Sequence, residues 1–440
     1  VQSCGELGAV FDADFIPQRH FLRRTVGFLL DPSVGLIQTP QHCINPDPLM
    51  RNLHMECWLL PDEESFYRWI QPLRSAWGAV VCAGTSFVAR RAALEEIGGF
   101  VEPAISEDLV TGMKLAGHGW KLRYLSEKLS AGLAAETMVD FVRQRQRWAA
   151  GTLQALRLPE GPLRQPGLSW EQRFAYTEGA LHWLNMIPRC ILVLMPLCIG
   201  LVGVMPIRIS GNGIAEQVLP LWITILFSVG WLNRGSRHAL LADLPNWALT
   251  VPLASTVVMS LLGRVPKFRI TPKHVSGHRG GLSMALATPL VVLLLLHSWN
   301  LTTLIRTIPA ASRSSDMLVG VLMSATWAIL TMLGLLTGLR ACYDPKRGDP
   351  TPWFGLDIPA TLKTSAEDGR IVTHTVTITA ISENGAEIRN LKRLHNNANG
   401  IDLTLDPSYC GEELPPFTVK QIQQNPTHLE WELSDRIAGM

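Results

Sequence analysis

The sequence has few charged residues and lacks the cysteine spacing typical of a zinc-binding or disulfide-rich protein. Asp, Glu, Lys and Arg make up 17% of the 440 residues, and the net charge is only +2 at pH 7. That balance gives no reason to expect nucleic acid as a partner. The eight cysteines include no C-x-x-C pair, so we expect reduced thiols and no zinc site.

The sequence begins at Val1, without a methionine or a recognisable signal peptide, and we expect it to be a fragment of a longer chain. Apolar residues, by contrast, make up 47% of it. This content is too high for an average soluble protein, and the length is too great for one domain. We therefore expect several domains, part of which lies in a membrane.

An acidic pair precedes a helical pattern. Glu107 and Asp108 stand at the head of a segment that runs to His118, in which apolar residues are spaced like one buried helical face. A carboxylate at a helix N-terminus is stabilised by free backbone N–H groups. From the local sequence alone, capping of the helix is therefore the favoured explanation of the pair, and catalysis is the alternative.

A cationic and aromatic cluster follows in the stretch 144–148. Arg147 offers a planar cation for a phosphate or carboxylate, and Trp148 a face on which a sugar ring can lie. The alternative is an amphipathic helix, from about Val142 to Leu156, whose arginines extend along a membrane surface beside a Trp anchor.

A short apolar run, Ala9 to Phe11, leads into Asp12 and Asp14 and predicts a strand whose carboxylates emerge at its end. Two such carboxylates can share a divalent cation with a diphosphate, which favours Mg²⁺ or Mn²⁺. An isolated D-x-D is also common in loops. Further strands are predicted at Val34 to Gln38 and at Trp120 to Leu125, and a helix directly after the Gly84-Thr85-Ser86 turn.

Several motifs together resemble a known family. Ser106-Glu107-Asp108, Gly119-Trp120-Lys121 and Gln144-x-x-Arg147-Trp148 are similar to the signature of processive family 2 glycosyltransferases, the membrane synthases of cellulose, chitin and hyaluronan. The runs 38–53 and 268–273 resemble the bacterial cellulose synthase catalytic subunits more than the other synthases.

This resemblance implies an α/β, GT-A-like glycosyltransferase domain at 1–157, of which only the C-terminal part is present because the chain is N-terminally truncated. A helical transmembrane region follows at 158–340, with interfacial helices and a gating loop at 266–280. A small PilZ-like β-barrel is implied at 341–440.

The implied reaction is processive, inverting transfer of glucose from UDP-glucose to a growing β-1,4-glucan, with translocation across a bacterial inner membrane. The resemblance makes Asp108 the general base beside Glu107, and Asp12 and Asp14 the ligands of Mg²⁺ or Mn²⁺. It also implies a periplasmic accessory subunit. The implied substrate-binding residues are Gly84, Thr85, Ser86, Gln144, Arg147, Trp148, Phe268, Thr271 and Lys273.

Within the gating loop, Phe268 is expected near the uracil and Lys273 near the diphosphate. The alternative is a basic linker attracted to anionic lipid.

Hydropathy predicts four spans, and charge predicts their orientation. The spans are expected at about 186–207, 217–233, 282–305 and 317–339. The uncharged segment from Trp247 to Gly263 is ambiguous, but an even number of crossings must separate the catalytic region from the gating loop, so we expect this segment to lie along the interface. Positive residues are concentrated between the second and third spans, as expected on the cytoplasmic side: Arg234, Arg237, Arg264, Lys267, Arg269, Lys273 and Arg279.

Alternating apolar and polar residues between Thr361 and Leu405 predict a small antiparallel barrel. Its position resembles the PilZ domain that confers cyclic di-GMP control. Arg347, Ser382 and Gly385 match that domain's motifs, whereas Thr351 and Ala380 depart from them. We therefore expect weak or absent cyclic di-GMP binding.

Two other functions remain open. One is a related synthase that uses UDP-N-acetylglucosamine or makes another glucan linkage. The other is a catalytically idle membrane protein whose barrel binds a nucleotide or a partner.

Overall fold

The computed structural model divides the chain into two compact units. One contains Val1–Lys273 and Arg279–Lys346, and the other contains His274–His278 and Arg347–Met440. The residues that the structure describes are 5–56, 58–204, 211–232, 243–264, 280–312, 315–346, 354–365, 371–382, 385–389, 401–405, 417–424 and 427–431. The three domain ranges inferred from the sequence stay predictions.

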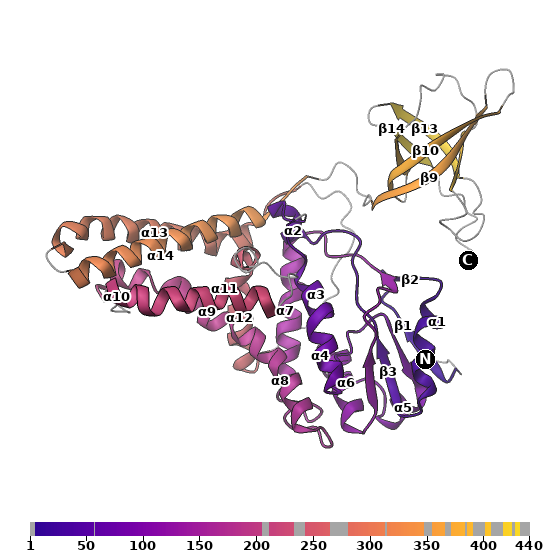
Figure 1. Cartoon of the computed structure of the whole chain (residues 1–440), viewed down its shortest axis with the longest axis horizontal. Helices are drawn as coiled ribbons and strands as arrows, with labels where there is room; N and C mark the ends of the chain where they lie inside the picture. Colours follow the sequence, from indigo (N-terminus) through magenta and orange to yellow (C-terminus); the bar gives the residue numbers. More distant parts are fainter. Residues whose placement is uncertain are drawn as a thin grey trace. The chain divides into compact units, whose positions relative to one another are not determined.

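A four-stranded mixed sheet lies at the centre of the N-terminal part (Figure 1). Its order is β1 (Leu7–Val10), β4 (Phe87–Arg90), β3 (Val34–Gln38) and β5 (Lys121–Tyr124). Strand β3 is parallel to β5 and antiparallel to β4. All five residues of β3 are buried, as its continuous apolar pattern predicts.

The segment after Gly84-Thr85-Ser86 corrects one expectation. It continues as strand β4, not as a helix, and the helix α5 (Arg91–Glu96) begins only after it. Phe87, Val88 and Ala89 are fully buried because β4 pairs with β1 on one side and β3 on the other. Pairing between distant strands thus decides the conformation of this short segment.

Short helices and turns connect the strands, and of three longer helices one precedes β5 and two follow it. The short elements are α1 (Phe21–Thr25), η1 (Val26–Leu30), α2 (Pro48–Leu53), α3 (Asp62–Ser65), η2 (Phe66–Ile70) and α4 (Gln71–Ala76), with the strand pair β2 (Ile16–Pro17) and β6 (Ser130–Ala131). The longer ones are α6 (Glu107–Gly117), α7 (Met138–Ala155) and α8 (Trp170–Leu184).

Helix α7 starts earlier than the apolar pattern suggested. Thr137 is its N-cap, and the Thr137 hydroxyl accepts a hydrogen bond from the backbone N–H of Asp140. One face of α7 shares a hydrophobic core with α12 (Trp247–Leu261) and with two long apolar helices, α13 (Met284–Ala311) and α14 (Ser315–Ala341). The expected basic helix is therefore held by tertiary packing.

Three of the described helices are long and apolar enough to cross a membrane: Ile214–Leu232, Met284–Ala311 and Met317–Ala341. The first combines η4 (Ile214–Val218) with α11 (Leu219–Leu232), after the short α10 (Gly211–Gly213). Helices α13 and α14 lie side by side (Figure 1). The 15-residue α12 is too short to qualify and is preceded by η5 (Leu244–Asn246).

The first predicted span is interrupted in the described residues. Helix α9 (Met186–Leu194) ends before Pro196, which lacks a backbone N–H, and η3 (Cys198–Val202) follows. The fully buried side chain of Asn300, from α13, bridges the interruption. Its Nδ2 donates to the Pro196 carbonyl and its Oδ1 accepts from the Gly200 N–H, each at 3.0 Å. The side-chain amide thus replaces one backbone hydrogen bond of a regular helix.

A two-stranded ladder closes the first unit. Strand β7 (Gly281–Leu282) pairs with β8 (Tyr343–Asp344), which follows α14 directly. Gly280 has a φ of +67°, and a Cβ there would lie 2.5 Å from the backbone nitrogen of Lys346. Glycine therefore allows the two segments to approach closely.

The described strands of the second unit form a closed barrel in the order β10-β11-β14-β13-β12-β9. They are β9 (Phe354–Ser365), β10 (Ile371–Ser382), β11 (Gly385–Arg389), β12 (Ile401–Leu405), β13 (Phe417–Gln424) and β14 (Thr427–Trp431). Ser382 and Gly385 face each other across the β10–β11 pair.

Candidate functional site

The acidic pair lies at the N-terminus of α6, as the sequence predicts. Ser106 is the N-cap residue, but its side chain caps no backbone N–H. Its hydroxyl instead lies against Gly151 of α7, where a Cβ would come within 2.1 Å of Ser106 Oγ. The Ile105 N–H also donates to Gln154 Oε1 of α7 at 2.9 Å. The acidic turn is therefore fixed to the helix that carries Arg147 and Trp148.

The glycine turn lies directly against Asp108. Gly84 has a φ of +81°, and a Cβ there would lie 2.8 Å from Asp108 Oδ2. Only glycine combines this left-handed conformation with such a close approach. The turn thus forms one wall of the space around the Asp108 carboxylate.

Buried hydrogen bonds hold the glycine turn in place. Gln38, which is fully buried, donates to the Thr85 carbonyl at 2.8 Å and accepts from the Ala83 N–H at 2.9 Å. The Thr39 hydroxyl donates to the Ser86 carbonyl at 2.8 Å. Sequence reasoning did not give Gln38 a role of its own. Its position at the end of a buried strand was the available signal, because a buried amide requires partners.

The D-x-D motif joins the same site through Thr85. The backbone N–H of Asp12 donates to Thr85 Oγ1 at 2.9 Å. Thr85 and Ser86 are both fully buried, and the Ser86 hydroxyl shares a hydrogen bond with that of Ser130. These two hydroxyls therefore support the turn from within the protein.

The two carboxylates of the motif follow β1 in a turn. Asp12 is exposed, Asp14 is half-buried, and the Leu133 N–H lies 3.4 Å from Asp14 Oδ2. Across the described part of the chain, no three His, Cys, Asp or Glu side chains form a group that could hold a metal ion. Two carboxylates nevertheless fit Mg²⁺ or Mn²⁺, since Mg²⁺ commonly uses one or two protein carboxylates, with water and substrate phosphate as its other ligands.

Burial raises the pKa of Asp108 to about 7. The negative charge of Glu107 raises this pKa further, whereas a hydrogen bond from the Leu109 N–H and the positive charge of Arg147 lower it. Arg147 is thus close enough to interact electrostatically with Asp108. A carboxylate with a pKa near neutrality is suited to general base catalysis.

Helix α7 presents Gln144, Arg147 and Trp148, all half-buried. Between them lies Arg145, which sequence reasoning did not assign to the site. Its guanidinium lies 4.9 Å from the Trp148 ring centroid and also pairs with Glu63. This contact fixes the orientation of the Trp148 ring. Arg145 occurs within the motif itself, and an arginine beside a tryptophan was the signal.

Some expected site residues lie outside the described residues. These are Phe268, Thr271 and Lys273 of the expected gating loop, and Arg347 of the expected cyclic di-GMP motif. The described site therefore brings together the D-x-D turn, the glycine turn, the acidic pair and α7.

Residues 9–339 match the family described as Glycosyl transferase family group 2. The chain therefore belongs to this family of glycosyltransferases. The resemblance inferred from the motifs is confirmed, because similar proteins include named cellulose synthase catalytic subunits.

Two relatives indicate the extent of the similarity. "Cellulose synthase 1" of Komagataeibacter xylinus is 28% identical over 387 residues, covering 88% of this chain and 25% of that protein. "Cellulose synthase catalytic subunit [UDP-forming]" of Pseudomonas fluorescens (strain SBW25) is 28% identical over 373 residues, covering 84% of this chain and 50% of that protein. The chain thus spans half or less of the length of these relatives.

Among solved structures, a mannosyltransferase from Pyrobaculum calidifontis in complex with GDP-Man and Mn²⁺ matches with a TM-score of 0.30 and 18% identity. The match covers 60% of this chain and 64% of that one. A similarity this low has no bearing on the site.

Proposed function

We propose that this chain belongs to the catalytic subunit of a processive, inverting glucosyltransferase that extends a β-1,4-glucan from UDP-glucose. The observation that carries the proposal is the placement of Asp108, with the Gly84 backbone against one carboxylate oxygen and the charge of Arg147 nearby. The names of the relatives support glucose as the sugar and UDP as the leaving group.

The proposed step moves one proton and exchanges one bond. The ionised Asp108 carboxylate takes the proton of a sugar hydroxyl at the end of the acceptor chain. The hydroxyl oxygen then bonds to the anomeric carbon of the donor, and the bond from that carbon to the diphosphate breaks. The electron pair leaves with UDP, and Arg147 stabilises the negative charge that develops.

The remaining residues orient the substrates. Trp148 offers a face for the acceptor sugar, with its ring held by Arg145, and Gln144 lies one helical turn away. Asp12 and Asp14 would hold a divalent cation, which supplies positive charge to the diphosphate. Phe268, Thr271 and Lys273 are proposed to contact the nucleotide from the loop 266–280.

The proposal also includes a location and further domains. Helices long and apolar enough for a membrane favour a multi-pass protein of the bacterial inner membrane, with the catalytic part and the barrel on the cytoplasmic side. The same proposal includes domain boundaries after residues 157 and 340. It also includes a periplasmic accessory subunit and a PilZ-like character of the barrel. We expect the barrel to bind cyclic di-GMP weakly or not at all, because Thr351 stands where the motif has an arginine and Ala380 where it has an aspartate.

The test uses the complete gene product in lipid nanodiscs with labelled UDP-glucose, beside labelled UDP-N-acetylglucosamine. We expect a cellulase-sensitive glucose polymer. A cellulase-resistant glucose polymer would show that the linkage is not that of cellulose. An N-acetylglucosamine polymer would show that the donor is UDP-N-acetylglucosamine instead of UDP-glucose. No polymer in the presence of Mg²⁺ or Mn²⁺ would favour the idle-protein alternative.

Asp108→Asn tests the mechanism in the same assay. The amide has the shape of the acid but cannot take a proton, so we expect synthesis to fall by about 10² to 10⁴ while UDP binding, measured by calorimetry, is kept. Glu95→Gln is the control, because it neutralises an exposed carboxylate that pairs with Arg91 within α5. Near-normal synthesis by Asp108→Asn would remove Asp108 from the mechanism.

A further inference from the structure

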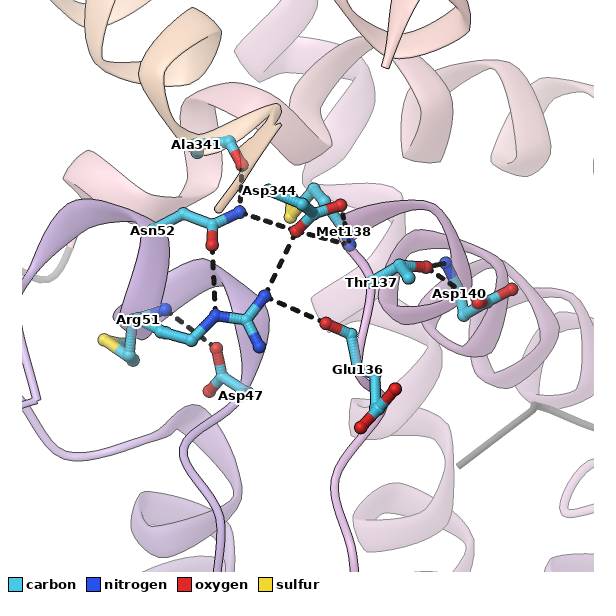
Figure 2. Close-up of polar contacts among 10 residues, drawn as sticks. Asp47, Arg51, Asn52, Glu136, Thr137, Met138, Asp140, Ala341 and Asp344 are labelled. Carbon is cyan, nitrogen blue, oxygen red and sulfur yellow. Dashed lines mark hydrogen bonds and ion pairs between the residues drawn. The ribbon is translucent and has the colours of Figure 1, made fainter. Parts of the chain in front are cut away.

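A buried polar cluster joins three segments that are far apart in the sequence (Figure 2). At its centre is Asp344, in β8 and only 3% exposed. Asp344 Oδ1 accepts from Arg51 Nη2 at 3.2 Å and from Asn52 Nδ2 at 2.9 Å, both in α2. Both of its carboxylate oxygens accept from the backbone N–H of Met138, at 3.2 and 3.0 Å. One carboxylate thus binds α2 and the first residue of α7.

The same cluster reaches the end of α14 and the segment before α7. Asn52 Nδ2 also donates to the carbonyl of Ala341 at 2.8 Å, and Arg51 Nη2 donates to that of Glu136 at 2.9 Å. Figure 2 shows these donors converging on Asp344 and the backbone beside it. A buried charge with this many directed donors is costly to disturb, since each lost partner leaves a polar group without water.

The cluster is also next to the exit of the expected gating loop. Gly281 of β7 pairs with Asp344 itself, and the Ser283 N–H donates to the Cys342 carbonyl at 3.0 Å. Gly281 follows residues 266–280 directly in the sequence. The strand that carries Asp344 therefore holds both the start of α7 and the chain leaving this loop.

The start of α7 matters because the helix carries Arg147 and Trp148. These residues lie nine and ten positions after Met138, or about 14 Å along the helix axis. The helix is rigid over this length, so a change in how its first turn is anchored to α2 and β8 alters the position of both side chains relative to Asp108.

We propose that Asp344 is a positioning residue for glycosyl transfer. It fixes the N-terminus of α7 relative to β7, the strand that follows the loop 266–280. This role rests on the proposed function. It differs from ordinary helix capping, because Thr137 already caps α7 through the Asp140 N–H.

Asp344→Asn tests the link selectively. If the amide oxygen takes the place of Oδ1, it keeps its donors in α2, but the amide nitrogen then faces the Met138 N–H, a second donor. We expect kcat for polymer synthesis to fall at least tenfold, with KM for UDP-glucose changed less than twofold because the backbone pairing of Asp344 with Gly281 is kept. Amide hydrogen exchange of the peptide covering 138–142 should accelerate at least tenfold.

Two controls separate positioning from stability. Thr137→Val removes the local cap of the same helix, and we expect it to change kcat less than twofold. Glu95→Gln removes an exposed ion pair within α5 and should leave exchange at 138–142 unchanged. If Asp344→Asn is poorly folded, Arg51→Lys is used instead, because lysine keeps the charge but cannot reproduce the guanidinium contacts; a threefold fall in kcat and the same local acceleration are expected.

An unchanged kcat in Asp344→Asn would overturn the proposal, as would an equal loss in Thr137→Val. If the unaltered protein makes no polymer, the proposed function has failed, and the exchange measurement still decides whether Asp344 holds α7. Unchanged exchange at 138–142 would then overturn that link as well.

Discussion

At the scale of single residues, the environment of Asp108 lowers the stability of the folded protein and makes the carboxylate a stronger base. Its pKa is raised because its carboxylate is held away from water beside Glu107. Between about pH 4 and pH 7 the folded state therefore binds more protons at this residue than the unfolded state does. Ionisation of Asp108 thus opposes folding, and its contribution to stability falls as the pH rises through this range.

This shift predicts the pH dependence of the reaction. Only the ionised carboxylate accepts a proton, so we expect kcat/KM for polymer synthesis to rise with pH and to level off above an inflection near 7. The measurement is a rate profile from pH 5 to 9 in mixed buffers at constant ionic strength. A profile that is flat between pH 5.5 and 8 would contradict a base with this pKa.

Resemblance to a family, not local chemistry, predicted which residues of the site matter. On local sequence alone, a helix cap was the favoured explanation of Asp108, and Arg147 could equally lie along a membrane surface. What the sequence does not display is the approach of Gly84 to Asp108 or the position of Arg145 over Trp148. Those contacts depend on how separate elements pack.

At the scale of elements, the glycine turn between Cys82 and β4 has one conformation because several elements hold it. Gln38 at the end of β3 and Thr39 after it bind its carbonyls, and Asp12 binds the Thr85 hydroxyl. The turn carries no charge of its own. Its contribution is to place backbone atoms where a side chain would block Asp108.

Gly84→Ala is therefore expected to impair the reaction more than it impairs folding. The new Cβ would meet Asp108 Oδ2 at 2.8 Å, and the positive φ adds roughly 1 to 2 kcal/mol of backbone strain. We expect polymer synthesis to fall at least tenfold. Gly98→Ala is the matched control, because its φ is +79° but no atom lies within 4 Å of the new Cβ.

Both variants should lower the midpoint of thermal unfolding by similar amounts, while only Gly84→Ala should lose activity. Equal activities for the two variants would show that contact with Asp108 is unimportant.

The boundaries predicted from the sequence agree with the structure where the apolar pattern was long or continuous. The expected strand at Val34–Gln38 matches β3, and the expected helix from Asp108 matches α6 to within a residue at each end. Strand β4 was missed because four residues after a turn carry little periodicity, and its pairing partners lie far away in the chain. Helix α7 begins at a threonine cap that precedes its charged stretch.

At the scale of the whole molecule, the order of membrane crossings determines where each loop lies. The argument from charge places Arg164 on the catalytic side and Ser312, at the end of α13, on the opposite side. Both residues are exposed. We expect a membrane-impermeant maleimide to label Ser312→Cys in intact spheroplasts and Arg164→Cys only in inverted vesicles.

Labelling is measured above that of the unsubstituted chain, which contains eight cysteines of its own. Labelling of both variants from the same side would show that the number of crossings between them is even, and the arrangement inferred from charge would then be wrong.

The interruption after α9 could not be foreseen from hydropathy, which reads the stretch 186–207 as one uniform span. Pro196 marks the place, but the compensating amide of Asn300 comes from a helix about a hundred residues later, and no local pattern links the two. The same holds for Asp344 and Met138, which are 206 residues apart. Long-range polar pairing of this kind is a property of the folded chain.

Asn300 has a consequence for how the protein is made. At a synthesis rate of about 5 to 20 residues per second, the ribosome needs roughly 5 to 20 seconds to reach Asn300 after it has passed Pro196. During that interval the peptide groups of Pro196 and Gly200 lack the partner that they have in the finished structure. In hydrocarbon such groups are strongly disfavoured. In the membrane location that the proposed function implies, these two groups must therefore bond to each other, to water or to the insertion machinery until the later helix arrives.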